Sequence, residues 1–302
     1  MSDDGPLVSL VMAAWRPRED WLRSAVDSAL GQTRCNVEVV VVDDGSPDPV
    51  EDALSELRDP RLRVVRAEHG GECAARNRGF AEARGEYVRF IDADDVLVPD
   101  STARLLALNG GRDDVIAYGA TSVCDADLRP LWKMVSRVQG DALEACLLGR
   151  FTVRVFSMLF PRRVVQLAGE WDGAFRVSHD WDFVLRALEH ATVRGDDATA
   201  TLYRKHADAA TTDVAAGEAG ARRAIDKYFE RHPAQRETRL RRRADARLNA
   251  IAARVLVSRG RRREAAGRFG SAVVADPTSV WAELVQGLPA VAGRARKLAS
   301  RA

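Results

Sequence analysis

The feature that most constrains the fold is a valine-rich run, Val37–Val42, which is apolar at five of its six positions. A strand with one face in water would alternate apolar and polar residues, whereas this run stays apolar at consecutive positions. Continuous apolar strands are typical of parallel sheets that helices cover on both faces. The run ends directly on Asp43 and Asp44, so polar side chains begin where the strand stops.

Similar strand-like runs alternate with helix-like segments through the first third of the chain. Strands are expected at 7–12, 37–42, 62–65 and 87–91, and helices at 21–30, 50–57 and 74–83. Such alternation is typical of βαβ units. The sequence therefore predicts an α/β fold with a Rossmann-like, mostly parallel central sheet flanked by helices. Ligands are expected beyond the carboxyl ends of its strands.

Two of these strand ends carry acids. Asp92-Ala93-Asp94-Asp95 follows the strand at 87–91 and offers the hard oxygen ligands that Mg²⁺ and Mn²⁺ prefer. The alternative is an acidic turn that caps the helix expected to start near Ser101. The second segment, Asp43–Ser46, has acids that can accept hydrogen bonds from a base or a ribose, or it is a solvated turn. No glycine-rich phosphate loop is present, so a nucleotide bound here would need a bridging cation for its phosphates.

The order and spacing of five segments resemble glycosyltransferase family 2 over residues 7–212. They are V-S-L-V-M-A-A-W at 8–15, V-D-S-A-L-G-Q-T at 26–33, E-V-V-V-V-D-D-G-S at 38–46, A-R-N-R-G at 75–79 and G-E-Y-V-R-F-I-D-A-D-D at 85–95. The resemblance implies the GT-A fold and an inverting transfer of sugar from a nucleoside-diphosphate sugar. It also implies a divalent cation, Mn²⁺ or Mg²⁺.

Matching positions carry the family's donor-site roles. Asp44 is expected to contact the base, Asp92 to face the ribose, and Asp94 to hold the metal. The family more often has a hydroxyl residue followed by Tyr-Asn in the first loop, so this chain departs from the pattern there and the base is less well defined. The full set expected at the donor is Ala13, Trp15, Asp43, Asp44, Arg76, Asp92 and Ala93.

The segment 169–186 resembles the family's catalytic segment and places Asp180 as the general base. A carboxylate there can deprotonate an acceptor hydroxyl while its oxygen attacks the anomeric carbon, and one displacement inverts the configuration. The alternative for Asp180 is the N-cap of the helix expected at 181–188. His179 and Trp181 are expected on the acceptor side, or His179 only fills space. Arg204 and His206 resemble a loop that contacts the diphosphate or metal, or they belong to a solvated basic loop.

Charge divides the chain into two parts. Residues 215–302 contain 20 Lys/Arg and 8 Asp/Glu, whereas residues 1–214 contain 26 and 36. We predict a GT-A domain over 1–214 and a basic, all-helical region over 215–302. The basic helices could bind anionic lipid headgroups peripherally, bind an anionic acceptor, or form a homodimer, or they are a solvated face. Nucleic acid is not expected, because few aromatic residues interleave the arginines.

No stretch approaches the roughly 20 apolar residues of a membrane span, and the N-terminus lacks the pattern of a signal peptide. A cytoplasmic location, or a peripheral one at the inner face of the membrane, is therefore expected. The predicted function is non-processive transfer of a sugar, from a UDP-sugar by preference, to an acceptor hydroxyl that the sequence does not identify. The alternatives are an inactive nucleotide-sugar-binding module of the same fold and a receiver-type signalling domain. The receiver reading leaves residues 62–95 and 169–186 without a role.

Overall fold

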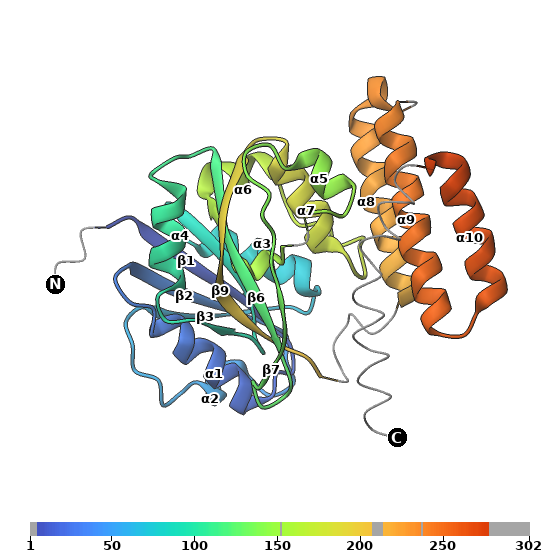
Figure 1. Ribbon diagram of the computed structural model, residues 1–302. Helices are drawn as coiled ribbons and strands as arrows, with labels where there is room; N and C mark the ends of the chain where they lie inside the picture. Colours follow the sequence, from blue (N-terminus) through green and yellow to red (C-terminus); the bar gives the residue numbers. More distant parts are fainter. Residues whose placement is uncertain (1–4, 152, 207–213, 237, 278–302) are drawn as a thin grey trace. The chain divides into compact units, whose positions relative to one another are not determined.

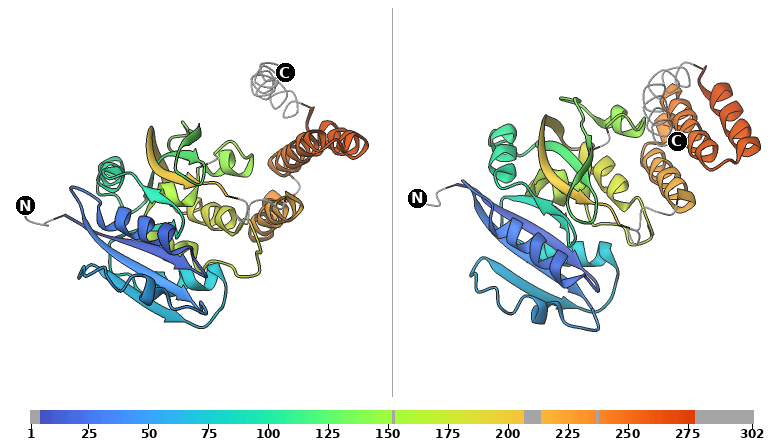
Figure 2. Two further views of the ribbon diagram at one scale, coloured as in Figure 1. Left: turned by 90° about the horizontal axis from the view of Figure 1, so that it is seen from below. Right: turned by 60° about the horizontal axis from the view of Figure 1, so that its bottom comes forward.

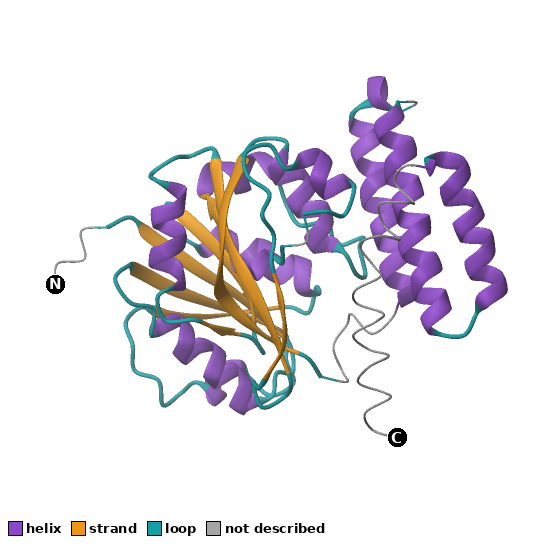
Figure 3. Cartoon of the chain, in the orientation of Figure 1, coloured by secondary structure: helices purple, strands orange, loops and turns teal. Residues whose placement is uncertain are grey.

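The computed structural model describes residues 5–151, 153–206, 214–236 and 238–277. The chain divides into two compact units, one made of Met1–Cys146 with Arg150–Thr212 and the other of Leu147–Gly149 with Asp213–Ala302. The first contains a nine-stranded sheet with helices packed on it, and the described part of the second is helical (Figure 1 and Figure 3). The domain boundary predicted at 214–215 stays a prediction, because residues 207–213 lie outside the described part.

Four parallel strands form the first half of the sheet, in the order β3-β2-β1-β4. In this register Ala13 lies opposite Val42 on one side and Asp92 on the other, so both acid segments reach the same edge. The strands predicted from the sequence are confirmed, and with them the α/β fold. Their bounds are β1 (Leu7–Ala14), β2 (Asn36–Asp44), β3 (Leu62–Ala67) and β4 (Tyr87–Asp92).

Alternate valines of β2 face opposite sides of the sheet, and both sides are covered. Val39 and Val41 belong to one core cluster that includes residues of α1, whereas Val40 and Val42 pack with Ala75 of α3 on the other side. Figure 2 shows helices on both faces of this sheet. Because neither face of β2 meets water, the strand is apolar at consecutive positions. The helices of this half are α1 (Glu19–Leu30), α2 (Val50–Ala53) and α3 (Glu72–Glu82).

Beyond β4 the sheet is mixed. β8 pairs antiparallel with both β4 and β6. β9 pairs parallel with β6 and antiparallel with β5, and β7 pairs antiparallel with β6. The pairing of β5 with β9 brings the end of β9 beside the segment that follows β4. The bounds are β5 (Val96–Leu97), β6 (Val115–Cys124), β7 (Pro130–Met134), β8 (Met158–Pro161), β9 (Thr192–Arg204), α4 (Ser101–Asn109), α5 (Leu143–Leu147), η1 (Val155–Ser157), α6 (Arg162–Ala168) and α7 (His179–Leu188).

The second unit confirms the predicted helical C-terminal region over its described residues. It contains α8 (Val214–Arg231), η3 (Pro233–Gln235), α9 (Arg239–Ser258) and α10 (Arg262–Ala275). Gly260, between α9 and α10, has a φ of +77°, which glycine adopts without strain. Within the described residues, no helix has the length and apolar character needed to cross a bilayer. The membrane and dimer roles of the basic helices stay predictions.

Candidate active site

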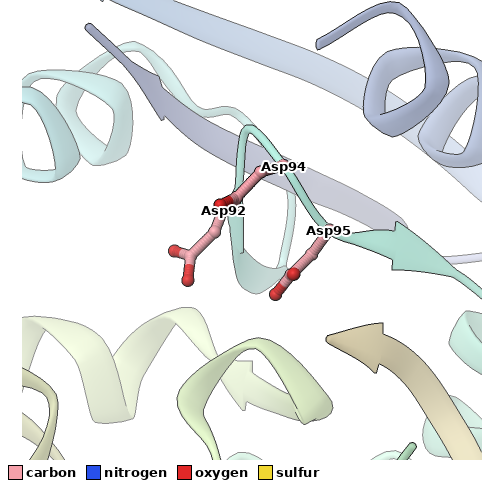
Figure 4. Close-up of side chains that lie close together, drawn as sticks. All are labelled: Asp92, Asp94 and Asp95. Carbon is pink, nitrogen blue, oxygen red and sulfur yellow. The ribbon is translucent and has the colours of Figure 1, made fainter. Parts of the chain in front are cut away.

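The segment after β4 gathers three carboxyl groups on one turn. Asp95 N–H donates to Asp92 O at 3.2 Å, which closes the turn. Ligand atoms of Asp92, Asp94 and Asp95 all lie within 4.8 Å of one another, and Figure 4 shows the three carboxyl groups on one side of the turn. The alternative that these acids cap a helix is wrong, because β5 separates them from α4, which begins at Ser101.

The donor set of this turn fits a divalent cation. Asp94 Oδ2 lies 2.8 Å from His206 Nε2, so an imidazole nitrogen, which can also bind a metal ion, lies beside the carboxylates. Asp95 is fully buried, and its Oδ2 has no hydrogen-bond partner within the described residues. Desolvation and the neighbouring acids raise the pKa of Asp95 well above its usual range. Crowded carboxyls with an unsatisfied oxygen are the arrangement that a Mg²⁺ or Mn²⁺ ion would relieve.

Arg204, predicted in a phosphate-contacting or solvated loop, is instead buried at the end of β9. Its backbone N–H donates to Asp95 Oδ1 at 2.9 Å and its Nε–H to Asp94 O at 2.9 Å. Its guanidinium lies 4.9 Å from the ring centroid of Trp21 in α1. Arg204 therefore holds the backbone of the acid turn, and His206, two residues later, is the member of the pair that contacts the carboxylate of Asp94.

Arg76 of α3 links the acid turn to its neighbours. Its side chain is 2% exposed, and Nη2 donates to Asp92 Oδ1 at 2.6 Å and to Glu72 Oε1 at 2.5 Å. Desolvation raises the pKa of Asp92 to about 6, because burial and repulsion from Glu72 outweigh the attraction of Arg76. Burial alone would also raise the pKa of Glu72, but the interactions with Arg76 and His179 outweigh this effect and lower that pKa to about 2.

His179 joins this cluster from α7. Arg76 Nη1 lies 3.4 Å from His179 Nδ1, and Glu72 Oε2 lies 3.1 Å from His179 Nε2. A guanidinium can only donate, so Nδ1 must accept and Nε2 must carry the proton that is donated to Glu72. These contacts define the tautomer of the imidazole and tie the first turn of α7 to α3. Asp180 is the next residue of that turn.

Asp180 is accessible and lies within α7. The helix begins at His179 after the N-cap residue Ser178, so the alternative that Asp180 is the N-cap is wrong. Asp180 Oδ1 accepts the N–H of Trp181 at 2.9 Å. Its Oδ2 lies 3.8 Å from Arg154 Nη1, which is longer than a hydrogen bond, and its side chain is 30% exposed. Within the described residues Oδ2 accepts no hydrogen bond, and a carboxylate oxygen of this kind with access to solvent can accept a proton from a bound hydroxyl.

Two tryptophans hold the segment around Asp180. Asn77, which follows Arg76 in the A-R-N motif, donates to Trp171 O at 3.0 Å and accepts the Trp171 N–H at 2.8 Å. Trp171 stacks on Phe183 of α7 with ring centroids 4.1 Å apart. Trp181, predicted on the acceptor side, donates its indole N–H to Cys146 Sγ at 3.2 Å. Arg76 and Asn77 of the A-R-N motif therefore attach α3 to α7 and to the segment that precedes α7.

The acid turn after β2 is of a different kind. Asp43 Oδ1 accepts the N–H of Ser46 at 2.8 Å, and Oδ2 accepts the N–H of Val50 at 3.2 Å and Nη1–H of Arg66 at 3.0 Å. The residue is 1% exposed. Both oxygens are therefore committed to shaping the turn and the start of α2.

Asp44, predicted to contact the donor base, is also engaged by the protein. Oδ1 accepts the N–H of Gly70 at 2.8 Å, and Oδ2 accepts the N–H of Gly71 at 3.0 Å and faces His69 Nδ1 at 2.9 Å. Its side chain is 3% exposed. In this arrangement the carboxylate fastens the loop between β3 and α3 and has little surface left for a ligand.

Trp15 is the most exposed of the predicted donor residues. Its side chain is 50% exposed and stacks on His69, with ring centroids 4.9 Å apart and an angle of 20° between the planes. The following residue, Arg16, donates its backbone N–H to Ser46 Oγ at 3.0 Å, which attaches the first loop to the turn after β2. The remaining two predicted donor residues, Ala13 and Ala93, are partly buried at the same edge of the sheet.

Four contributors to the site were missed in the sequence interpretation: His69, Glu72, Asn77 and Asp95. Glu72 lies four residues before Arg76, a spacing at which side chains on a helix meet, but it falls outside the helix expected at 74–83 and joins α3 only in the structure. Asp95 belongs to the quoted D-A-D-D segment and Asn77 to the quoted A-R-N motif. His69 had no readable signal, because its partners Asp44 and Trp15 come from other strands.

Comparison with known proteins identifies the family. Residues 9–166 match the sequence model of "Glycosyl transferase family 2". The match spans more than half of the chain, and the protein belongs to this family.

Relatives and a solved structure agree with that assignment. The succinoglycan biosynthesis protein ExoO of Rhizobium meliloti is 29% identical over 326 residues, covering 99% of this chain and 89% of that protein. An uncharacterized glycosyltransferase of Rickettsia typhi is 29% identical over 216 residues, covering 70% of this chain and 67% of its own length. The structure of S. aureus TarS, residues 1–349, in complex with UDP superposes with a TM-score of 0.55 at 16% identity, covering 93% and 91% of the two chains. At that identity the likeness shows the fold.

Proposed function

We propose that this protein transfers a sugar from a nucleoside-diphosphate sugar, with a UDP-sugar as the preferred donor, to an acceptor hydroxyl with inversion at the anomeric carbon. The observation that carries the proposal is the pair of acid sites in one family 2 domain. They are the crowded turn Asp92–Asp95 with His206, and the accessible carboxylate Asp180. Family membership and the UDP bound by the structurally similar TarS support it.

In this proposal Asp180 is the general base. Its Oδ2 accepts the proton of the acceptor hydroxyl while the hydroxyl oxygen attacks the anomeric carbon from the side opposite the diphosphate. One displacement of this kind inverts the configuration. Glu72 and Arg76 hold His179, which precedes Asp180, and this limits the freedom of the carboxylate.

Asp94 and His206 are the residues proposed to hold Mn²⁺ or Mg²⁺, with Asp92 toward the ribose. Bound there, such a cation supplies Lewis-acid neutralisation of the departing diphosphate. Asp95 and Arg204 hold the turn in place, because Arg204 donates hydrogen bonds to Asp95 Oδ1 and to Asp94 O. The partly buried surroundings exclude part of the solvent, and this strengthens electrostatic interactions with the diphosphate.

The proposed acceptor is a glycan or another hydroxyl-bearing precursor of a surface polysaccharide. ExoO, named for succinoglycan biosynthesis, supports this class, since the match covers nearly all of this chain. TuaG of Bacillus subtilis, named for putative teichuronic acid biosynthesis, is 32% identical over 162 residues, 51% of this chain and 64% of that protein.

The test is the variant Asp180→Asn. We expect UDP to bind with unchanged affinity in MnCl₂, and release of UDP from a panel of UDP-hexoses, with water or glycan acceptors, to fall by about a hundredfold or more, the scale of a lost general base. Asp100→Asn, an exposed carboxylate at the start of α4, is the matched control and should turn over like the wild type. Normal turnover in Asp180→Asn would remove Asp180 from this role. A wild-type protein that binds UDP but releases none from any donor would be a binding module.

A further inference from the structure

The loop between β3 and α3 contains a histidine whose two ring nitrogens have different environments. His69 Nδ1 lies 2.9 Å from Asp44 Oδ2 and 3.0 Å from Asp44 O. A carboxylate and a carbonyl can only accept, so Nδ1 must carry the proton. In the neutral ring Nε2 then has an open lone pair. Within the described residues Nε2 has no hydrogen-bond partner, and the side chain is 54% exposed.

The position of this ring is tightly defined. Gly45 has a φ of +68°, and a Cβ at that position would lie 2.8 Å from the backbone nitrogen of His69, so the turn after β2 can approach His69 only because residue 45 is glycine. The N–H groups of Gly70 and Gly71 bind Asp44 on the other side. The loop therefore holds His69 in one position at the edge of the sheet where the parallel strands end.

The same ring stacks on Trp15, which is half exposed. Together they form an aromatic surface beside the acid edge, with the outer rim of His69 open to solvent. Flat aromatic surfaces bind nucleobases by stacking, and they do so without regard to which base it is. Discrimination between bases then depends on a hydrogen-bonding atom at the rim.

We propose that His69, and not Asp44, reads the edge of the donor base, with Asp44 acting as the positioning residue that holds His69 in its Nδ1–H tautomer. This rests on the proposed function, in which a nucleoside diphosphate is the donor. An unprotonated Nε2 accepts a hydrogen bond, so it pairs with an N–H group at the edge of the base. In the UDP donor of the proposed function that group is the ring N3–H, because uracil carries no amino group, whereas cytosine and adenine lack this ring N–H and offer only an exocyclic amino group.

The experiment is calorimetric titration of the full chain in MnCl₂ at neutral pH with UDP, TDP, GDP, CDP and ADP, together with N3-methyl-UDP, whose ring N–H is blocked. Two variants separate the parts of the site. His69→Phe keeps an aromatic ring for the stack and removes Nε2, and His69→Ala removes both. His190→Phe, at an exposed histidine after α7, is the control. Melting temperatures without ligand report whether each variant is folded.

We expect the wild type to bind UDP about tenfold more tightly than CDP and N3-methyl-UDP, the effect of one hydrogen bond that the analogue leaves unmade. In His69→Phe the three affinities should agree within about twofold, while the affinity for CDP stays near the wild-type value. In His69→Ala all three affinities should weaken by a further factor of about five or more, since the variant loses a ring on which the base stacks. The control should behave as the wild type.

Two results would overturn the inference while leaving the proposed function in place. One is a wild type that prefers CDP or ADP, or treats UDP and N3-methyl-UDP alike. The other is a His69→Phe variant that keeps the full preference for UDP, which would return the base contact to Asp44 or to the backbone. If no diphosphate binds the wild type, the proposed function itself fails and the inference with it.

Discussion

The turns Asp43–Ser46 and Asp92–Asp95 are both acidic, but the protein satisfies their carboxyl groups to different extents. Each follows a buried parallel strand and begins with an acid at the same edge of the sheet. In the first turn the carboxylates of Asp43 and Asp44 accept hydrogen bonds from nearby backbone, arginine and histidine donors. In the second turn three carboxyl groups crowd together, and one oxygen of Asp95 is buried without a partner.

The difference teaches that an acid at a strand end is not in itself a ligand site. Where donors from the protein satisfy the carboxylates, the turn holds loops in place. Where donors are fewer, the ionised form of the carboxyl is disfavoured, and desolvation raises the pKa of Asp92 to about 6. A cation is the partner proposed for the second turn, whereas the first turn acts through the residues that it holds.

The largest expected effect is on stability in the first turn. Asp43→Ala should lower the free energy of unfolding by about 3 kcal/mol, because it leaves Arg66 and two backbone N–H groups without their buried acceptor. Urea unfolding measures this, with Asp94→Ala as the matched variant from the second turn, which should change stability by less than about 1 kcal/mol. Equal losses in the two variants would erase the contrast between the turns.

The second effect is on binding in the second turn. Asp94→Ala should weaken UDP binding in MnCl₂ by about thirtyfold to a hundredfold, while binding in EDTA stays at the wild-type level. Calorimetric titration measures both. Asp127→Ala, an acid 67% exposed in the β6–β7 connection, is the control. If manganese strengthens UDP binding to Asp94→Ala as much as to the wild type, the cation is held elsewhere.

A smaller effect tests the unsatisfied oxygen. Asp95→Asn should raise the free energy of unfolding in EDTA by about 1 kcal/mol at pH 7, because the amide removes a buried charge and still accepts the N–H of Arg204. The folded protein raises the pKa of Asp95, so the wild type loses stability as pH rises above the usual aspartate range. The advantage of the variant should therefore grow from about pH 4 upward. An advantage that is the same at pH 3 and pH 7 would contradict this.

The smallest effect concerns Glu72, which supports Arg76 beside the second turn. Glu72→Gln should lower the free energy of unfolding by about 0.5–1 kcal/mol at pH 7, a modest value because the side chain is 42% exposed and solvent screens the pair. The folded state lowers the pKa of Glu72 from 4.5 to about 2. The stabilisation is therefore present above about pH 4.5 and lost as pH falls toward 2. Thermal unfolding against pH, with Glu68→Gln as control, measures it, and a difference that persists at low pH would argue for a packing effect instead.

Much of the first unit could be predicted from the sequence. The valine-rich run 37–42 predicted a strand buried on both faces, and the edge where the acids would meet followed from the parallel arrangement. The mixed pairing beyond β4 was not predicted, because β5 and β8 are too short to carry a clear periodicity. The helix start at His179 was placed two residues late, since Ser178 caps it in a left-handed conformation that residue type alone does not indicate.

The sequence by itself determined the family through its motifs, and it determined the positions of the first four strands and the acids that end them, because apolar runs are a local property of the chain. Only the tertiary structure decided which acids are satisfied. Asp44 meets His69 across 25 residues and Asp94 meets His206 across 112. The state of a carboxylate depends on the donors and the solvent within a few ångströms, and those come from distant parts of the chain that only folding brings together.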